Sequence, residues 1–535
     1  MELRPLQTPA TSAALWLGAF GHPAFVVIWT ASTSALIGIA MYDTASGWLM
    51  TTLDLNPLHV SLLRAATTLP MFLVTLPAGA IADIIDARRM LIGVSWMIAA
   101  LMAIFAAFVS LDLASPLLLL LTTFVLSGAW ALNAPAWLSI VPLMVPKQDI
   151  PGVIGANGVG YNISRTVGPA LGGLIIMKYG LAAPLWIFAA ANLAVIAALT
   201  WWRAPAKEAP HLPAERLRSA LRTGLRHAVN NPALRATMAR TVAIYPFTAA
   251  YWGLLPLIAR RTGEGAQHYG LLLSAVSVGA VLGSIAYPYV RRRLGADWLV
   301  AFETILTAVA LALFAVAQDL AIALCACVLA GSAWVSILTC LYVSAQNVLP
   351  AWVRGRGLAV FLTVVFGAMT AGSTAWGEIA DRIGLPNALL LAAAGAIVAI
   401  PLSWRWKLQH TTLDLSPSQH WSLPTTHHEI GHDRGPVLVK IDYRIDPEDR
   451  VTFLRALDEL GYERRRDGAF AWGIFEDAED LARYEETYLI DSWLELMHLR
   501  ERVTNADRML EEEIRQMLVQ PPRIEFLVAA KRTGA

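Results

Sequence analysis

The sequence predicts an α-helical membrane protein with twelve transmembrane helices in two six-helix halves, followed by a small soluble α+β domain. Of its 535 residues, 56% are hydrophobic and only 15% are charged, and the mean hydropathy is +0.53. A soluble chain has nowhere to bury so much apolar surface. The formal net charge of +1 lacks the basic excess of a nucleic-acid-binding protein, so no nucleic-acid partner is expected.

Charge is unevenly distributed along the chain. Residues 436–535 hold 15 Lys or Arg and 22 Asp or Glu, whereas the first 435 residues hold only 26 and 18. A long apolar body is therefore followed by a soluble acidic domain. The three cysteines have no metal-ligand spacing with nearby histidines, and neither a metal nor a cofactor is expected.

Twelve apolar segments are long enough to cross a bilayer, which takes about 20 residues for about 30 Å of hydrocarbon. The first six lie at 24–50, 59–81, 90–110, 116–141, 151–178 and 182–202. The second six lie at 237–259, 268–290, 297–317, 320–346, 357–380 and 386–406. The expected domains are an N-terminal half (1–202), a linker (203–236), a C-terminal half (237–406), a polar linker (407–435) and a soluble domain (436–535).

Basic residues predict the orientation, because cytoplasmic loops carry an excess of Lys and Arg. The connections that share a side with the N-terminus, together with the central linker, hold most of them, including Arg88, Arg89, Lys147, Arg291 to Arg293, Arg354 and Arg356. Both termini are therefore expected in the cytoplasm. Within the linker, Leu217, Leu221 and Leu225 recur at helical spacing between arginines, which is typical of an amphipathic helix on the inner leaflet or of a solvated linker helix.

The soluble domain has the pattern of a ferredoxin-like α+β sandwich. A strand is expected at 437–445, then a helix that begins after Asp446-Pro447 and ends near residue 460. Asp467-Gly468 indicates a hairpin between 464–466 and 469–475. A strand near 487–490, one long helix over 493–518 and a last strand at 523–529 complete the expected order.

Three ionisable residues stand out within the predicted spans, where an unpaired charge costs about 2.5–3.5 kcal/mol. Arg165 is near the centre of the fifth span, and Asp43 and Arg64 are at similar depths in the first two spans. Asp43 and Arg64 form either a structural ion pair or part of a functional site, whereas Arg165 is expected to face a cavity. Asp297 and Glu303 lie near the end of the ninth span and are expected to snorkel toward water as structural residues.

The fifth span is unusually rich in glycine, with seven glycines between residues 155 and 180. Glycine lets helix backbones approach closely, and Pro169 removes a helical hydrogen bond. This composition favours a helix that slides or bends over a rigid one, although tight static packing is the alternative.

Two motifs resemble those of the major facilitator superfamily. Gly79-Ala-Ile-Ala-Asp83-Ile-Ile-Asp86-Ala-Arg88-Arg89 is similar to its G-x-x-x-D-R-x-G-R-R-x signature, with Ile84 and Asp86 as departures. The fifth span resembles the signature of the superfamily's antiporters, which are exporters. Its matching positions are Gly155, Ser164 (in place of a glycine), Gly168, Pro169, Gly172 and Gly173.

The resemblance narrows to the transmembrane secretion effector family, which includes enterobactin exporters. It is carried by Asn133-Ala-Pro-Ala-Trp137, by Asn162 to Gly173, by Leu254 to Leu257, by Tyr269 to Leu272 and by Arg354-Gly355-Arg356. In the soluble domain, Arg465 to Ala469 and Trp493 to Thr504 are similar to the family's pattern, but Leu496 and Arg500 stand where the family has histidines.

A conformational latch is expected at the first motif. Asp83 ends the second span, where a carboxylate can accept hydrogen bonds from the positive N-terminus of another helix, and the eleventh span begins beside Arg354 and Arg356. The latch set is Gly79, Asp83, Arg88, Arg89, Arg354 and Arg356. Making and breaking such a latch would close and open the two halves toward the cytoplasm.

The resemblance implies a proton-coupled exporter of a siderophore-, drug- or metabolite-like molecule in a bacterial inner membrane, working by alternating access. The expected partners are membrane lipid, a small-molecule substrate and the proton. The substrate or coupling cavity is expected to contain Asp43, Arg64, Asn133, Trp137, Asn157, Tyr161, Arg165, Tyr245 and Trp252. The alternatives are an importer of the same superfamily, or a membrane-anchored protein whose terminal domain is enzymatic, regulatory or homodimerising.

Overall fold

The computed structural model describes residues 20–203, 217–263, 265–350, 352–408, 416, 418, 430–431 and 434–530. The polar linker therefore lies mostly outside the described residues. The chain forms two compact units. The first unit comprises the described parts of Met1–Ala214, Ala239–Leu341 and Leu362–Trp406. The second unit comprises the described parts of Glu215–Met238, Tyr342–Phe361 and Lys407–Ala535.

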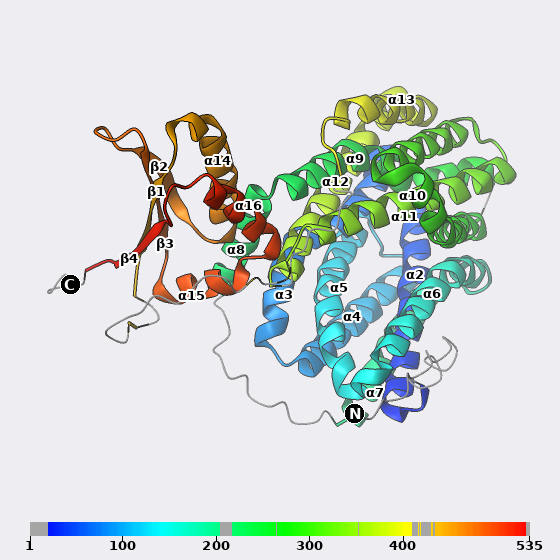
Figure 1. Ribbon diagram of the computed structural model, residues 1–535. Coiled ribbons are helices and arrows are strands. Elements are labelled where there is room, and N and C mark those ends of the chain that lie inside the picture. Colours follow the sequence, from blue (N-terminus) through cyan, green and yellow to red (C-terminus); the bar gives the residue numbers. More distant parts are fainter. Residues whose placement is uncertain are drawn as a thin grey trace, which may run out of the picture. The chain divides into compact units, whose positions relative to one another are not determined.

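The first unit is a bundle of long helices, seen in Figure 1. The helices of its first half are α2 (Pro23–Leu53), α3 (Pro57–Ile84), α4 (Ala87–Ser110), α5 (Pro116–Met144), α6 (Ile150–Tyr179) and α7 (Ala183–Trp201). The helices of its second half are α9 (Pro232–Thr262), α10 (Ala266–Val316), α11 (Leu320–Asn347), α12 (Arg354–Ile383) and α13 (Leu385–Ser403). The ends of some of these helices belong to the other unit.

Among the described residues, ten helices are long and apolar enough to cross a membrane. One of them, α10, has 51 residues and breaks at Gly295, whose φ of 73° ends one helix and starts another, so it holds the eighth and ninth spans. The helix α6 is outside the ten because its glycines, asparagines and Arg165 lower its hydropathy, although its 30 residues can cross a bilayer. The twelve predicted transmembrane helices are confirmed.

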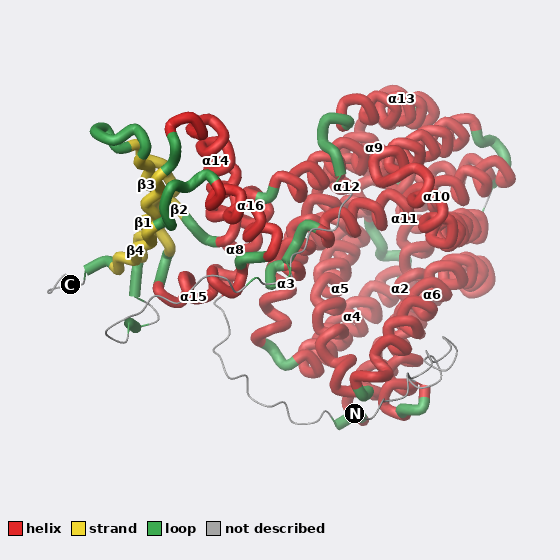
Figure 2. The backbone as a smooth tube through the Cα atoms, viewed as in Figure 1, coloured by secondary structure: helices red, strands yellow, loops and turns green. Residues whose placement is uncertain are grey.

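The second unit contains a four-stranded antiparallel sheet in the order β2-β3-β1-β4, the only strands in Figure 2. Its strands are β1 (Val437–Arg444), β2 (Phe470–Glu476), β3 (Arg483–Ile490) and β4 (Arg523–Val528), and its helices are α14 (Arg450–Asp467), α15 (Trp493–Arg502) and α16 (Asn505–Gln516). The expected ferredoxin-like order of strands and helices is confirmed. As predicted, Asp446 caps the turn before α14, because its carboxylate accepts a hydrogen bond from the Glu448 amide.

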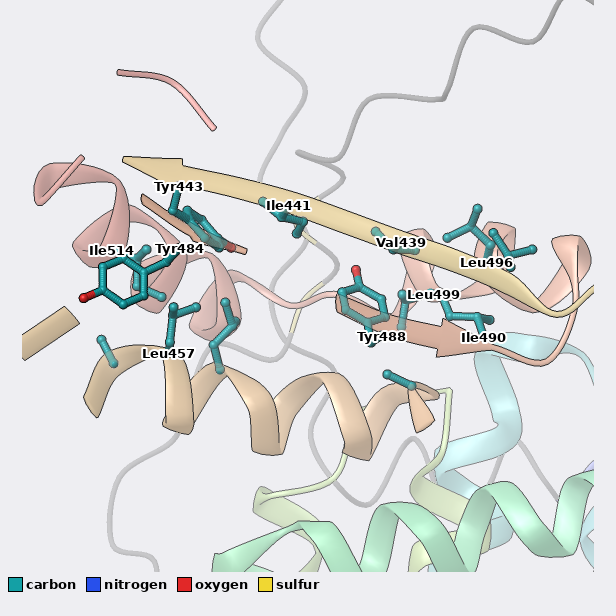
Figure 3. Close-up of a cluster of buried hydrophobic side chains, with 14 of the residues drawn as sticks. Val439, Ile441, Tyr443, Leu457, Tyr484, Tyr488, Ile490, Leu496, Leu499 and Ile514 are labelled. Carbon is teal, nitrogen blue, oxygen red and sulfur yellow. The ribbon is translucent and has the colours of Figure 1, made fainter. Parts of the chain in front are cut away.

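One face of the sheet carries the core of this domain. Alternate residues of β1 and β3 are buried, and Figure 3 shows Val439, Ile441 and Tyr488 among side chains that lie between the strands and α14. The intervening residues, such as Lys440 and Thr487, are half-exposed. One face of the sheet is therefore apolar and covered by helices.

Two expected elements of this domain are wrong. The residues 464–466 belong to α14, not to a strand, and Gly468, with φ 149°, ends that helix by donating its amide hydrogen to the Arg464 carbonyl. The hairpin instead joins β2 and β3. The single long helix expected after residue 493 is two helices, because Val503 leaves helical geometry between them.

The linker helix α8 (Leu217–Asn230) belongs to the same unit as the C-terminal domain and packs against α14. His227 of this helix is fully buried. Its ring lies edge-on to Trp352 with the centroids 5.7 Å apart, and its Nδ1 lies 3.9 Å from the Asp467 carboxylate. Leu225 is exposed, and the side chains of Leu217 and Leu221 lie outside the described residues. The face of α8 that packs against protein was not predicted.

Candidate substrate and coupling site

The glycines of α6 let this helix lie directly against α2. A Cβ atom on Gly168 would lie 2.6 Å from the Ala40 Cβ, and one on Gly172 would lie 3.0 Å from the Met41 Cα, so neither position has room for a side chain. Ser164, which stands where the antiporter signature has glycine, is buried and donates its hydroxyl to the Gly160 carbonyl. Gly155 is half-buried near the start of the helix.

The far end of α6 touches the second half of the bundle. A Cβ atom on Gly173 would lie 2.8 Å from the Gln267 Cα of α10. We call this end, where the 179–183 and 262–266 connections lie, the distal end. Further contacts between the halves lie there, because Arg260 donates to the Thr51 hydroxyl at 2.9 Å. The two halves are therefore in contact at the distal end.

Asp43 lies in α2 with its side chain exposed, although residues of other helices surround it. Its carboxylate interacts electrostatically first with Arg64 of α3 and then with Arg165 of α6. Among the described residues, no basic nitrogen lies within 4.0 Å of this carboxylate and no side chain donates a hydrogen bond to it. The structure brings Asp43 and Arg64 near each other, but they do not form a direct ion pair.

The two arginines lie over one indole ring. The Arg64 guanidinium carbon is 4.6 Å from the centroid of Trp252 of α9, and that of Arg165 is 6.0 Å from the same centroid. Arg165 also donates a hydrogen bond of 2.9 Å to the Tyr161 hydroxyl. Five of the predicted cavity residues thus form one cluster that joins both halves of the bundle, which we call the arginine cluster: Asp43, Arg64, Tyr161, Arg165 and Trp252.

An aromatic chain continues from the arginine cluster into the second half. The rings of Trp252 and Trp334 are 5.8 Å apart, and those of Trp334 and Tyr245 are 5.4 Å apart, both edge-to-face. Tyr245 is buried with its hydroxyl unpartnered, whereas Trp334 of α11 is half-exposed. Sequence reasoning missed Trp334, because one more tryptophan in an apolar span carries no signal of its own.

Three other predicted cavity residues lie outside these contacts. Asn133 and Asn157 are half-buried, and Trp137 packs against the apolar core of the first half, among residues such as Phe25 and Ile140. The described contacts do not connect these three residues with the arginine cluster.

The predicted latch residues are only partly described. Gly79 and Asp83 occupy the last turns of α3, and their surroundings lie outside the described residues. Arg88 donates from its Nε to the Leu199 carbonyl at 2.8 Å and thereby binds the C-terminal end of α7. The backbone amide of Arg89 donates to Asp86, which caps α4.

The two latch arginines of the second half, Arg354 and Arg356, lie in the first turn of α12. Arg354 is exposed there and donates from its Nε to the Leu349 carbonyl at 3.4 Å. Arg356 lies against α8, since a Cβ atom on Gly224 would be 3.0 Å from the Arg356 Cβ.

The structure contradicts the expectation that Asp297 and Glu303 snorkel. Asp297 is buried in an ion pair with Arg240 of α9, and the Arg240 guanidinium also lies 5.6 Å from the Trp404 ring. Glu303 is buried beside Ser336. Arg240 lies eight residues inside α9, and its partner 57 residues away was not recognisable from spacing. Among the described residues, no group of three His, Cys, Asp or Glu could hold a metal ion.

The profile of the transmembrane secretion effector family matches residues 15–534. The chain belongs to this family. It is therefore an integral membrane transporter of the major facilitator superfamily, as the resemblance implied, and not an enzyme. It contacts lipid and a small-molecule substrate.

Curated relatives and solved structures agree with this family. The multidrug efflux pump Tap of Mycolicibacterium fortuitum is 26% identical over 68% of this chain and 90% of its own length. The staphyloferrin A transporter of Staphylococcus aureus is 21% identical over 70% of this chain and 93% of its own.

Two solved structures share the fold at low identity. A bacterial homologue of the lysosomal transporter Spinster, in an inward-facing conformation, has a TM-score of 0.53 and 15% identity over 76% of this chain and all of its own. A peptide transporter of the POT family has a TM-score of 0.56 and 10% identity over 71% of this chain and 95% of its own.

Proposed function

We propose that this transporter is a proton-coupled exporter of a siderophore-, drug- or metabolite-like molecule across the bacterial inner membrane, with both termini in the cytoplasm. The observation that carries the proposal is the antiporter-like helix α6, whose glycines press against α2 and, at the distal end, against α10. The names of two relatives support it, since one is a multidrug efflux pump and the other transports a siderophore.

Alternating access fits this geometry. The halves touch at the distal end through Gly173 and Arg260, and the arginine cluster joins α3, α6 and α9. A helix without side chains at its contacts can slide or tilt without unpacking a core. Release on the far side of the membrane would then require the Gly173 contact to open, with Asp83 latching the cytoplasmic end in the same step.

Asp43 is the proposed proton carrier. It is the carboxylate of the arginine cluster, it is exposed, and it has no direct ion-pair partner among the described side chains, so it can take up and release a proton. Arginine cannot release its proton at physiological pH, so Arg64 and Arg165 would instead set the affinity of that carboxylate for its proton. In the alternative, Asp43 stays next to Arg64 throughout the cycle and has only a structural role.

For the C-terminal domain we propose a homodimerising or regulatory role. Its sheet is covered by helices on one face, and a second copy could cover the other, where half-exposed Lys440 and Glu485 form an ion pair. The mass in solution of residues 436–535, measured by light scattering, tests the dimer, and a monomer at high concentration would contradict it.

Transport in sealed vesicles of both orientations tests the exporter. Inverted vesicles with an imposed pH gradient, acidic inside, should accumulate substrate, and a protonophore should abolish the accumulation. Right-side-out vesicles that accumulate the same substrate under an inward proton gradient would instead identify an importer. Because the substrate is unidentified, the first measurement uses a panel of fluorescent dyes and iron-chelating hydroxycarboxylates.

A further inference from the structure

The arginine cluster holds more positive than negative charge. Among the described side chains it contains two guanidinium groups, of Arg64 and Arg165, and one carboxylate, of Asp43. The two guanidinium groups lie over the same indole and repel each other. Inside a membrane an uncompensated charge is costly, so a site with this composition is stabilised by an added anion.

The hydrogen bonds of the cluster are also incomplete. Among the described residues, the buried Nε of Arg64 has no hydrogen-bond partner, and Arg165 makes one side-chain hydrogen bond, to the Tyr161 hydroxyl. A guanidinium has five N–H donors in a planar fork that matches a carboxylate. Unused N–H donors beside a surplus positive charge therefore form a binding site for a planar anion.

The surroundings of the two arginines are aromatic. The half-exposed indole of Trp334 lies against Trp252 on one side and Tyr245 on the other. Such rings bind flat apolar groups by stacking or edge-to-face contact. The Tyr245 hydroxyl is buried and unpartnered, so it offers a hydrogen bond to a polar atom of the same ligand.

We infer that the substrate is an aromatic organic anion whose carboxylate binds between Arg64 and Arg165 and whose ring lies against Trp334. This inference rests on the proposed function, because it takes the arginine cluster as the substrate site.

The test uses the full chain in lipid nanodiscs and three probes of equal shape: 2-naphthoate, the neutral 2-naphthamide and the cationic 2-naphthylmethylammonium. Calorimetry should give a dissociation constant for naphthoate about tenfold or more below that for the amide, with no binding of the ammonium. The R64Q and R165Q variants should each lose this preference. R382Q should keep it, because Arg382 is exposed and pairs only with Glu378 among the described residues. Equal binding of naphthoate and amide, or no binding of either, overturns the inference.

Thermal unfolding without any probe gives a second measurement. If the positive charge is uncompensated, R64Q should unfold at or above the temperature of the wild type, whereas R240Q should unfold lower, because it leaves the buried Asp297 without its ion-pair partner. An equal loss in both variants would mean that Arg64 is as fully paired as Arg240, and would overturn the inference.

The two proposals fail separately. If inverted vesicles export neutral dyes under a pH gradient while naphthoate shows no advantage over the amide, only the anion site is wrong. If naphthoate binds with the expected dependence on both arginines but no vesicle accumulates any compound, the exporter is wrong and the anion site stands.

Discussion

The arginine cluster of the membrane bundle can be compared with a second group of arginine, carboxylate and aromatic residues in the core of the C-terminal domain. In the domain, Arg464 pairs with Glu511 at 2.8 Å and approaches Glu486 at 3.7 Å. Glu486 is fully buried and accepts hydrogen bonds from the Tyr443 hydroxyl and from the Trp472 indole. In the bundle, Arg64 has a buried N–H without a partner, and Asp43 is exposed without a direct ion pair among the described residues.

The charges of the domain cluster are compensated within the protein core. Burial opposes the charge of Arg464, but Tyr488, Glu511 and Glu486 outweigh it and raise the pKa of this arginine. For Tyr443, burial is the main cause of a raised pKa and Glu486 raises it further, so the phenol stays neutral. Asp43, which has no direct ion-pair partner among the described residues, is the carboxylate for which we propose a change of charge during the cycle.

The largest effect is expected from removing the charge of Arg464. R464M leaves Glu486 and Glu511 without their ion-pair partner in the domain core, which should lower the free energy of unfolding of this domain by about 3–5 kcal/mol. Hydrogen exchange in the intact protein should show that the amide hydrogens of β3 and α14 lose protection by the factor that this loss of unfolding free energy implies. The control R483M removes an arginine whose ion pairs with Asp442 and Asp477 are exposed, and should change exchange little. Equal losses in both variants would contradict the structural role.

The helix α6 provides the next test, on transport. G172L or G168L should insert and fold but reduce export to background, because the side chain must fit where Met41 or Ala40 of α2 already lies. G158L is the matched control, since a Cβ atom there meets nothing within 4 Å. Efflux assays with expression-matched membranes measure the result. Normal export by both bulky variants would exclude a close-packed moving helix.

These tests concern features that the sequence predicted to different degrees. Most of the spans were predictable because a long apolar segment is enough to cross a bilayer. The helix α6, whose polar residues lower its hydropathy, was predictable from its length. The boundary at Gly468 was not, because Asp-Gly ends a helix as readily as it turns a hairpin, and only the packing of α14 under the sheet decides between them.

The candidate site shows the same division. Glycine spacing predicted a close-packed α6, and depth along the helices placed Asp43 and Arg64 at one level. Arg165 was expected to face a cavity, but depth did not place it beside those two residues. The role of Trp252 as their shared platform, and the pairing of Arg240 with Asp297, depend on how α9 is rotated against its neighbours. Rotation is fixed by packing across many residues, so no short motif records it.

The third expected effect concerns proton coupling. D43N should abolish export driven by a pH gradient but preserve substrate binding and downhill exchange, because it removes the titrating group and keeps the side chain's size. If Asp43 is only a structural neighbour of Arg64, D43N should lower stability, and D43N with R64Q should restore much of both stability and transport. A double variant that pumps against a gradient at the normal rate would eliminate Asp43 as the carrier.

The latch should give a smaller but still strong reduction of transport. D83N keeps the size of the side chain but removes the charge that a helix N-terminus would stabilise. We expect normal insertion and strongly reduced efflux. D86N is the comparison, because an asparagine side chain can still accept the Arg89 amide hydrogen bond that caps α4, so we expect little change in stability or in transport. Wild-type efflux by D83N would exclude the latch.

The smallest effect is expected at Arg226. This arginine is less completely paired than Arg464 but, unlike Arg64, has a carboxylate within 4.0 Å. This arginine of α8 donates to the Gly468 carbonyl at 3.0 Å and lies 3.5 Å from the Glu495 carboxylate, with 16% of its side chain exposed. R226Q should weaken the packing of α8 on the C-terminal domain by about 1 kcal/mol, since a hydrogen bond to a partly solvated charge contributes no more.

Hydrogen exchange of α8, with trypsin cleavage of the 203–236 linker as a second measurement, tests this effect. L225S is the control, because Leu225 is 54% exposed and its loss removes little packing. If R226Q loosens α8 by as much as R464M loosens β3, the contact between the linker and the domain is part of the domain core. If it loosens α8 slightly and leaves β3 unchanged, the domain folds independently and holds the linker through a separable contact, as a regulatory module requires.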